Sequence, residues 1–138
     1  MQANAGTITP NGVILEEHEY ATVLFLTEQG YDVELIRASA IEGTKSPDIK
    51  MSGFVWEMKS PIGKGKWVIK NIMQKASHQS ENVIIDLRRL KQYPQEKYIN
   101  EAIQRFESIT RLKRLKIIGK LSEKEKIFLK RKNNSCII

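Results

Sequence analysis

A Ser-Gly pair at positions 52 and 53 constrains the fold of this chain more than any other feature. It is flanked by two short segments, Ile49–Met51 and Phe54–Lys59, whose composition is typical of β-strands. A two-residue turn between two such segments predicts a tight antiparallel hairpin. If the two strands pair regularly from this turn, Asp48 lies directly opposite Glu57 on the same face of the sheet, whereas a β-bulge would shift that register.

Strand side chains alternate between faces, so Lys59 shares the face of Asp48 and Glu57. The other face carries side chains that suit a core: Ile49, Trp56 and Met58. Opposed carboxylates repel, and a divalent cation such as Mg²⁺ turns that repulsion into a binding site. A nearby lysine can neutralise charge on a phosphate or orient an attacking water. On these residues alone, a surface hairpin in which Lys59 simply neutralises Glu57 stays open.

The rest of the chain alternates between helical and strand patterns. Helices are predicted over 16–29, 67–78 and 95–110, and further strands over 31–36, 83–87, 115–118 and 127–129. This order predicts a single domain of the α/β (α+β) class with a mixed β-sheet flanked by helices. We expect residues 1–13 to be a loose leader, residues 14–132 to form the domain, and residues 133–138 to be a tail.

The positive charge of the chain is confined to one end. Residues 111–132 hold ten Lys or Arg and two Glu, so this segment carries a charge of +8. The remainder of the chain carries −1, which gives the net charge of +7. A basic segment of this kind predicts a polyanionic partner, either nucleic acid or an anionic membrane. No run of 18 apolar residues occurs, so membrane insertion is not expected. The single cysteine, Cys136, excludes an internal disulfide and a cysteine-based metal site.

Two groups of basic residues are candidates for nucleic-acid contacts. A glycine loop contributes Lys64 and Lys66, for which a solvated loop is the alternative. The basic end contributes four more: Arg111, Lys113, Arg114 and Lys116.

The spacing of Pro47-Asp48 and Glu57-Met58-Lys59, with eight residues between Asp48 and Glu57, resembles the signature of the PD-(D/E)XK nuclease superfamily. The resemblance implies a restriction-endonuclease-like fold in which Asp48 and Glu57 bind Mg²⁺ or Mn²⁺. It implies that Lys59 assists the nucleophilic water, and the backbone carbonyl of Met58 could supply another metal ligand.

The opening helix, HEYATVLFLTEQGYDV, is similar to the first helix of that superfamily, which bears a metal-binding glutamate. The resemblance places Glu19 at the metal, directly or through water, with Glu17 as the alternative. An acid in the first turn that interacts only with the helix dipole is the other interpretation of Glu19.

Residues 45–89 also resemble nuclease domains at the C-terminus of bacterial polymorphic toxins, including contact-dependent growth inhibition effectors that cleave transfer RNA. This resemblance implies a cognate immunity protein, delivery as the C-terminal part of a secreted toxin, and action in the bacterial cytoplasm. It also implies that Gln79 belongs to the active site, whereas a polar residue at a helix end is an equal alternative.

The sequence therefore predicts a metal-dependent nuclease acting on RNA, with transfer RNA favoured through the toxin resemblance. A DNA endonuclease of restriction, repair or mobile-element type would have the same core. A non-catalytic basic nucleic-acid-binding module is the third hypothesis. We expect His18 and His78 to be structural, and Asp86 to be a buried, paired acid that does not bind the metal.

Overall fold

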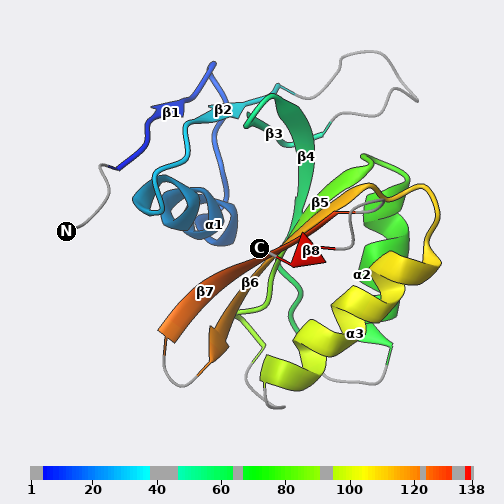
Figure 1. The fold of residues 1–138 in the computed structure, drawn as a ribbon. Helices are drawn as coiled ribbons and strands as arrows, with labels where there is room; N and C mark the ends of the chain where they lie inside the picture. The colour runs from blue at the N-terminus through cyan, green and yellow to red at the C-terminus, as the bar shows by residue number, and fades with distance from the viewer. Residues whose placement is uncertain are drawn as a thin grey trace.

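The computed structural model describes residues 5–37, 47–63, 67–90, 95–121, 124–131 and 136–137. The helices are α1 (Glu17–Glu28), α2 (Val68–Ser77) and α3 (Gln95–Ser108). The strands are β1 (Ile8–Thr9), β2 (Val33–Leu35), β3 (Ile49–Met51), β4 (Phe54–Lys59), β5 (Asn82–Asp86), β6 (Arg114–Leu121), β7 (Lys124–Arg131) and β8 (Cys136–Ile137). They form one sheet in which the spatial order of the strands is their order along the chain (Figure 1).

The sheet is mixed, as the sequence predicted. The pairs β1–β2, β4–β5 and β5–β6 are parallel, and the other neighbouring pairs are antiparallel. The two parallel crossovers at the centre are made by α2 and α3, because parallel neighbours need a long connection between them. The prediction of a single mixed α/β domain is confirmed, and the ends of all three helices lie within two residues of the predicted ones.

The β3–β4 hairpin has the register that the Ser-Gly turn predicts. Ile49 pairs with Trp56, and Met51 pairs with Phe54. Ser52 and Gly53 have φ angles of 56° and 83°. Positive φ at both central residues is the geometry of the turn that matches strand twist in two-residue hairpins.

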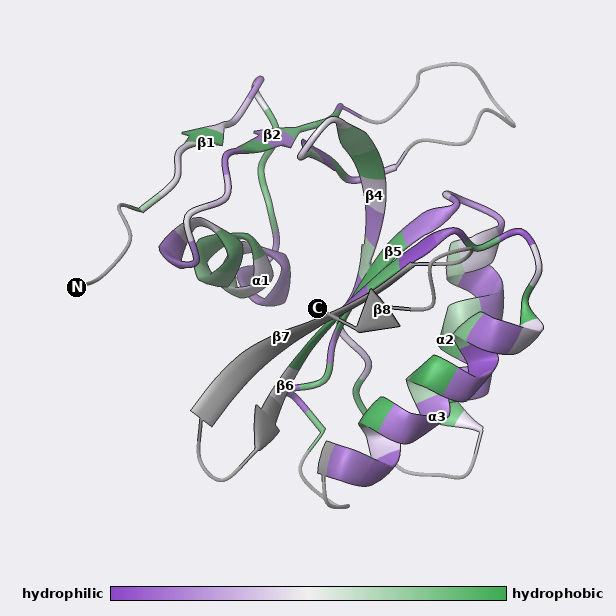
Figure 2. Ribbon diagram, viewed as in Figure 1, coloured by the Kyte–Doolittle hydropathy of each residue, from purple (hydrophilic) through white to green (hydrophobic). Residues whose placement is uncertain are grey.

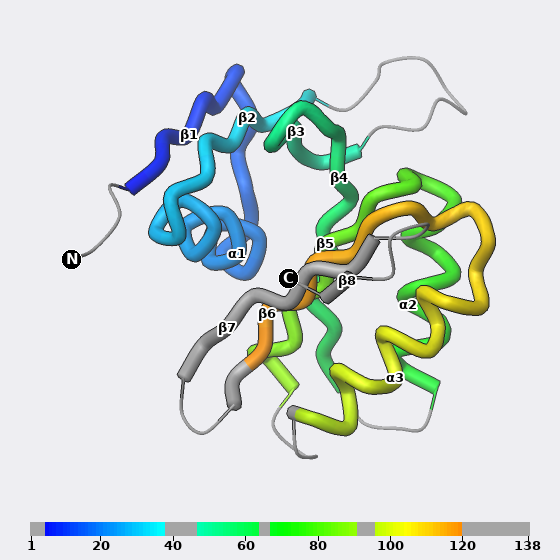
Figure 3. The backbone as a smooth tube through the Cα atoms, viewed as in Figure 1, coloured from blue at the N-terminus to red at the C-terminus, as the bar shows by residue number. Residues whose placement is uncertain are grey.

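The sheet has a hydrophobic cluster on each side. On one side, α2 and α3 pack on β5 and β6 around Val83, Ile85 and Phe106. On the other side, α1 packs over β2, β3 and β4, and Ile84 of β5 joins this second cluster. Strand β5 is therefore buried on both faces and runs between α1 and the α2–α3 pair (Figure 3). Figure 2 shows its apolar colour between helices that carry both apolar and polar colours.

The segment expected to be a loose leader is held to the domain from residue 5 onward. Ile8 and Thr9 pair with β2 in parallel, and the N–H of Gly6 donates to the Thr27 carbonyl at 2.7 Å. Thr7 donates to the Asp32 carboxylate from its backbone N–H and its hydroxyl, at 2.9 and 3.0 Å. In the expected tail, β8 pairs with β7. Short edge strands of this kind carry little periodicity, which is why the sequence did not indicate them.

None of the helices in the described residues is both long and apolar enough to cross a bilayer.

The packing of residue 6 tests whether the N-terminal segment belongs to the fold. A Cβ at Gly6 would overlap the backbone carbonyl of Tyr31. Gly6→Ala should therefore lower the free energy of unfolding by about 1–3 kcal/mol, as overpacking does elsewhere. Urea denaturation followed by tryptophan fluorescence measures this, with the exposed neighbour changed in Ala5→Ser as the control. Equal stability of the two variants would show that the segment is loose after all.

Candidate functional site

Asp48 is held against β4 by two backbone contacts. Its N–H donates to the Trp56 carbonyl at 2.9 Å, and its Oδ2 accepts the N–H of Met58 at 2.8 Å. The first contact joins Asp48 to Trp56, which also pairs with Ile49, so the regular register of the hairpin ends at Ile49. The second fixes the carboxylate itself, so Asp48 is positioned by backbone geometry rather than by a flexible side-chain partner.

Glu57 is buried, with 4% of its surface exposed. The Nζ atom of Lys59 lies 3.1 Å from Glu57 Oε2. The other oxygen, Oε1, is buried, and no described residue makes a hydrogen bond with it. A buried carboxylate oxygen without a partner is costly and needs an explanation, for which a bound ion is one of the ordinary candidates.

The two carboxylates have perturbed acidities. Burial, followed by the nearby charge of Asp48, raises the pKa of Glu57 from 4.5 to about 7, and Lys59 opposes the rise. Burial also raises the pKa of Asp48, against the hydrogen bond from Met58, and the charge of Glu19 adds to the rise. Both carboxyl groups are therefore costly to ionise where they lie, and a divalent cation would offset that cost.

The pair opens into a cavity of about 300 Å³ between α1, α2 and the end of β4. The lining residues are His18, Glu19, Asp48, Glu57, Met58, Lys59, Ser60 and Ile72. Predicted candidates from both the hairpin and the first helix thus meet at one cavity.

Glu19 reaches this cavity with one oxygen already engaged. Its Oε1 accepts the backbone N–H of Glu16 at 2.9 Å, at the start of α1. Within the described ranges, no group of three or more His, Cys, Asp or Glu side chains is arranged to hold a metal ion. The candidate metal centre therefore consists of the Asp48–Glu57 pair, with Glu19 at its edge.

Gln79 is not among the residues that line the cavity. It follows the C-terminal end of α2, where the neighbouring Ser80 and Asn82 bind the carbonyl of Val55 near the start of β4. Its Oε1 atom is buried, and no described residue makes a hydrogen bond with it. The structure thus does not place Gln79 on the lining of the acid-pair cavity, and its role in the active site stays a prediction.

The predicted basic contacts differ in their accessibility. Arg111 and Lys113 are exposed, and Arg111 Nη1 lies 2.7 Å from His78 Nδ1. Arg114 stacks on the ring of Phe54 at 3.7 Å. The candidates Lys64 and Lys66 lie outside the described residues.

Lys116 corrects the expectation of a surface contact. It is 3% exposed, and its Nζ donates to the Tyr31 hydroxyl at 3.0 Å. The ammonium also lies 4.5 Å from the ring centre of Tyr31 and 5.6 Å from that of Trp56. Trp56 is on the face of β4 opposite Glu57, so Lys116 reaches neither solvent nor the acid pair.

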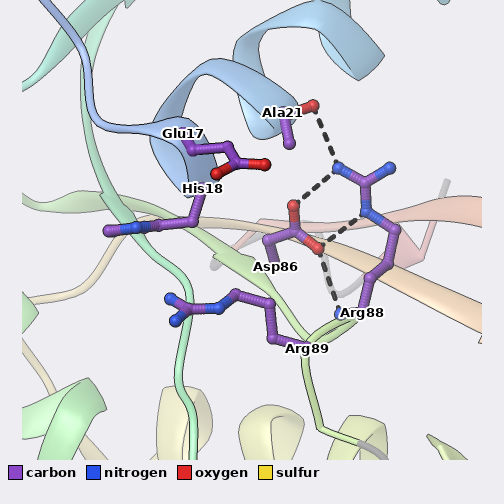
Figure 4. Close-up of a pocket in the computed structure, with 6 residues that line it drawn as sticks. All are labelled: Glu17, His18, Ala21, Asp86, Arg88 and Arg89. Carbon is purple, nitrogen blue, oxygen red and sulfur yellow. Dashed lines mark hydrogen bonds and ion pairs between the residues drawn. The ribbon is translucent and has the colours of Figure 1, made fainter.

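A second cavity, of about 420 Å³, lies beside the first, since His18 lines both. Its lining residues are Glu17, His18, Ala21, Asp86, Arg88 and Arg89 (Figure 4). Asp86 is 3% exposed and pairs with Arg88 at 2.8 Å, which agrees with its expected burial and pairing. The two arginines of this lining were not among the predicted site residues. The feature of the sequence that could have indicated them is their position directly after the buried strand that ends in Asp86.

This chain matches one family model and one solved structure. The family model described as "Contact-dependent growth inhibition CdiA C-terminal domain" matches residues 45–123. The solved structure described as "CdiA-CT/CdiI toxin and immunity complex from Burkholderia pseudomallei" is similar, with a TM-score of 0.60 and 20% sequence identity. The alignment covers 88% of this chain and 98% of that one, and at this identity it shows a shared fold. Comparison with curated proteins gave no match.

The family match covers more than half of the chain and includes Asp48, Glu57 and Lys59. The chain therefore belongs to the family of contact-dependent growth inhibition CdiA C-terminal domains.

Proposed function

We propose that this chain is the toxin domain of a contact-dependent growth inhibition protein and acts as a metal-dependent nuclease. The observation that carries the nuclease proposal is the buried Asp48–Glu57 pair, with an unpartnered Glu57 oxygen and Lys59 within 3.1 Å. The spacing of these residues, which resembles the PD-(D/E)XK signature, supports the same chemistry. We further propose that the substrate is RNA, and transfer RNA in particular, by the resemblance of residues 45–89 to toxins that cleave it.

The toxin part of the proposal is supported by the family and by the similar structure, which is a complex of a toxin with its immunity protein. We infer that a cognate immunity protein neutralises this chain. Delivery as the C-terminal part of a secreted protein and action in the cytoplasm of the target bacterium belong to the same proposal.

The donors at the site fit Mg²⁺ or Mn²⁺. Mg²⁺ is usually held by one or two carboxylates together with water and substrate phosphate, and this centre offers two carboxylates. Asp48 and Glu57 would hold the ion, with the Met58 carbonyl as a further oxygen and Glu19 acting through water. A bound ion would supply Lewis acidity toward a phosphoryl oxygen and would make a bound water more acidic.

Lys59 has the position for a role in the reaction itself. Its side chain is 23% exposed, so it reaches from the buried Glu57 into the open part of the cavity. From there its ammonium can donate to a water or to a phosphate oxygen and offset the negative charge that develops during attack. Preorganised charge of this kind, in a site that excludes most water, is often the largest contribution to catalysis.

Removal of any of the three groups should abolish cleavage. We expect Asp48→Asn, Glu57→Gln and Lys59→Met each to reduce cleavage of total RNA by about 100-fold or more, because removal of one such charge interaction has effects of that order. The assay compares total RNA with plasmid DNA in Mg²⁺, Mn²⁺ or EDTA. Expression of the wild-type chain in bacteria should arrest growth, and Glu57→Gln should relieve the arrest.

The hairpin offers matched controls for this assay. Glu34 and Lys50 are exposed and lie opposite each other on β2 and β3. Glu34→Gln and Lys50→Met make the same chemical changes outside the cavity and should retain activity. Cleavage that persists in EDTA would remove the metal mechanism, and an inert wild-type chain would leave only a binding module. Cleavage of plasmid but not of RNA would identify a DNA endonuclease.

The raised pKa of Glu57 predicts a pH-dependent stability in the absence of metal. Below pH 4.5 the carboxyl is protonated in both the folded and the unfolded chain, so its burial is then least costly. As the pH rises from 4.5 to about 7, the unfolded chain ionises first, and the free energy of unfolding should fall. Urea denaturation across this range should show the fall in wild type but a smaller one in Glu57→Gln. Parallel curves for the two proteins would contradict a raised pKa.

Mg²⁺ should act in the same pH window. The ion competes with the proton for Glu57, so its affinity should increase as the pH rises through about 7. Calorimetric titration at two pH values measures this and should also detect released protons.

Among the predicted nucleic-acid contacts, the exposed Arg111 and Lys113 should contribute to affinity through phosphate contacts. We expect Arg111→Gln and Lys113→Gln each to reduce the slope of log affinity against log salt concentration by about 1. Lys116→Met should leave the slope unchanged, because that ammonium is buried. RNA binding is measured in EDTA to prevent cleavage. A full effect of Lys116→Met, with none from the other two variants, would place the phosphate path elsewhere.

A further inference from the structure

The cavity of about 420 Å³ shares a wall with the acid-pair cavity. His18 lines both cavities. The Thr22 hydroxyl lies 3.2 Å from Ser60 Oγ, which lines the first cavity, and donates to Asp86 Oδ2 of the second at 2.7 Å. The wall is therefore about one side chain thick, and a group in the second cavity would be a near neighbour of a phosphate at the acid pair.

Part of this cavity is rigid structure. Arg88 Nε donates to Asp86 Oδ1 at 2.9 Å, and Arg88 Nη2 donates to Asp86 Oδ2 at 2.8 Å. The same guanidinium donates to the Ala21 carbonyl of α1 at 3.0 Å (Figure 4). These contacts neutralise Asp86 and link α1 to the end of β5. The charges of Asp86 and Arg88 therefore compensate each other and are not available to a ligand.

The other charged residues of the lining have opposite signs. Glu17 is exposed at the rim, and Arg89 Nη1 donates to the Ser60 carbonyl at 3.1 Å. A guanidinium carries five N–H donors, so this contact occupies only part of its capacity. Because the lining sums to no net charge, it lacks the excess of cations that a phosphate site requires.

The side chains suit a nucleobase instead. The His18 ring is partly exposed, at 34%, and lies on the same side of the view as the Arg89 guanidinium (Figure 4). Unstacked bases in RNA complexes stack on histidine rings and guanidinium planes and form hydrogen bonds along their edges. The Glu17 carboxylate can only accept, so it favours a base with an exocyclic amino group, while Arg89 donates to a ring nitrogen or carbonyl.

We propose that this cavity binds the base of a nucleotide adjacent to the cleaved phosphate, and that it selects a base with an exocyclic amino group over uracil. The proposal rests on the proposed function, because it assigns the neighbouring nucleotide of that substrate. His18 and Arg89 provide the stacking surfaces, and Glu17 provides the selectivity.

The test uses nucleosides, which contain no phosphodiester bond to cleave. The chain has only two histidines, His18 and His78, so their imidazole signals can be followed separately. Cytidine and uridine are titrated into metal-free protein while the imidazole C–H signals are followed by NMR. Cytidine should shift the His18 signal at roughly tenfold lower concentration than uridine, as one base-edge hydrogen bond discriminates by about that factor. His78, which contacts Arg111, should not move.

Matched variants on one helix test the selectivity. In Glu17→Gln the amide can both donate and accept, so the difference between cytidine and uridine should disappear. Glu28→Gln makes the same change at the exposed far end of α1 and should preserve the difference.

Three results would overturn the proposal. They are no shift of the His18 signal, an equal shift of that signal with the two nucleosides in wild type, or a shift of that signal with inorganic phosphate alone. The nuclease assay is independent of this titration. A chain that cuts RNA without a selective His18 response refutes only the base site. A selective response in a chain that cuts no nucleic acid refutes the nuclease, and with it the assignment of the base to a cleaved substrate, but not the selective base site itself.

Discussion

The proximity of Asp48 and Glu57 at the open end of a tight hairpin is the constraint on which the candidate site depends. The turn fixes the register as far as the Ile49–Trp56 pair, and beyond that pair the Trp56 carbonyl and the Met58 N–H hold Asp48 in place beside Glu57. Helices α1 and α2 then enclose the pair and bury Glu57. Two carboxylates kept this close repel each other when both are ionised, so a cation beside them is stabilising. Lys59 contacts only the Oε2 atom of Glu57 and leaves Oε1 without a partner among the described residues.

The hairpin and its neighbours could be predicted from sequence because they obey local rules. A Ser-Gly turn determines pairing over a few residues on each side, and α2 and α3 show 3.6-residue periodicity over 10 and 14 residues. Helix α1 lacks this periodicity and is indicated instead by the absence of Pro and Gly within it and by Gly30 after its end. The two-residue strands β1 and β8 offer no such pattern. Their pairing depends on which backbone groups of β2 and β7 remain open, which no local pattern reveals.

Lys116 shows why a charge in the sequence did not indicate a surface in the fold. Residues on β6 alternate between faces, so a lysine between Leu115 and Ile117 suggests a half-exposed strand. Its actual partner, the Tyr31 hydroxyl, is 85 residues away in sequence. The second cavity has the same origin, since Thr22 and Asp86 are 64 residues apart and meet only when α1 docks on the end of β5. Contacts of this range follow from the three-dimensional packing of layers.

The coincidence of strand order with chain order has a mechanical consequence. Within the part of the chain that the structure describes, each interior strand is flanked in the sheet by its immediate predecessor and successor, and no strand is inserted between two earlier ones. Force applied at either terminus therefore loads one edge strand at a time and peels the sheet from that edge, so that the interior never has to be extracted through strands that are still paired. A chain with this topology can be threaded through a narrow passage in small steps, and it can re-form its sheet in the order in which its residues emerge.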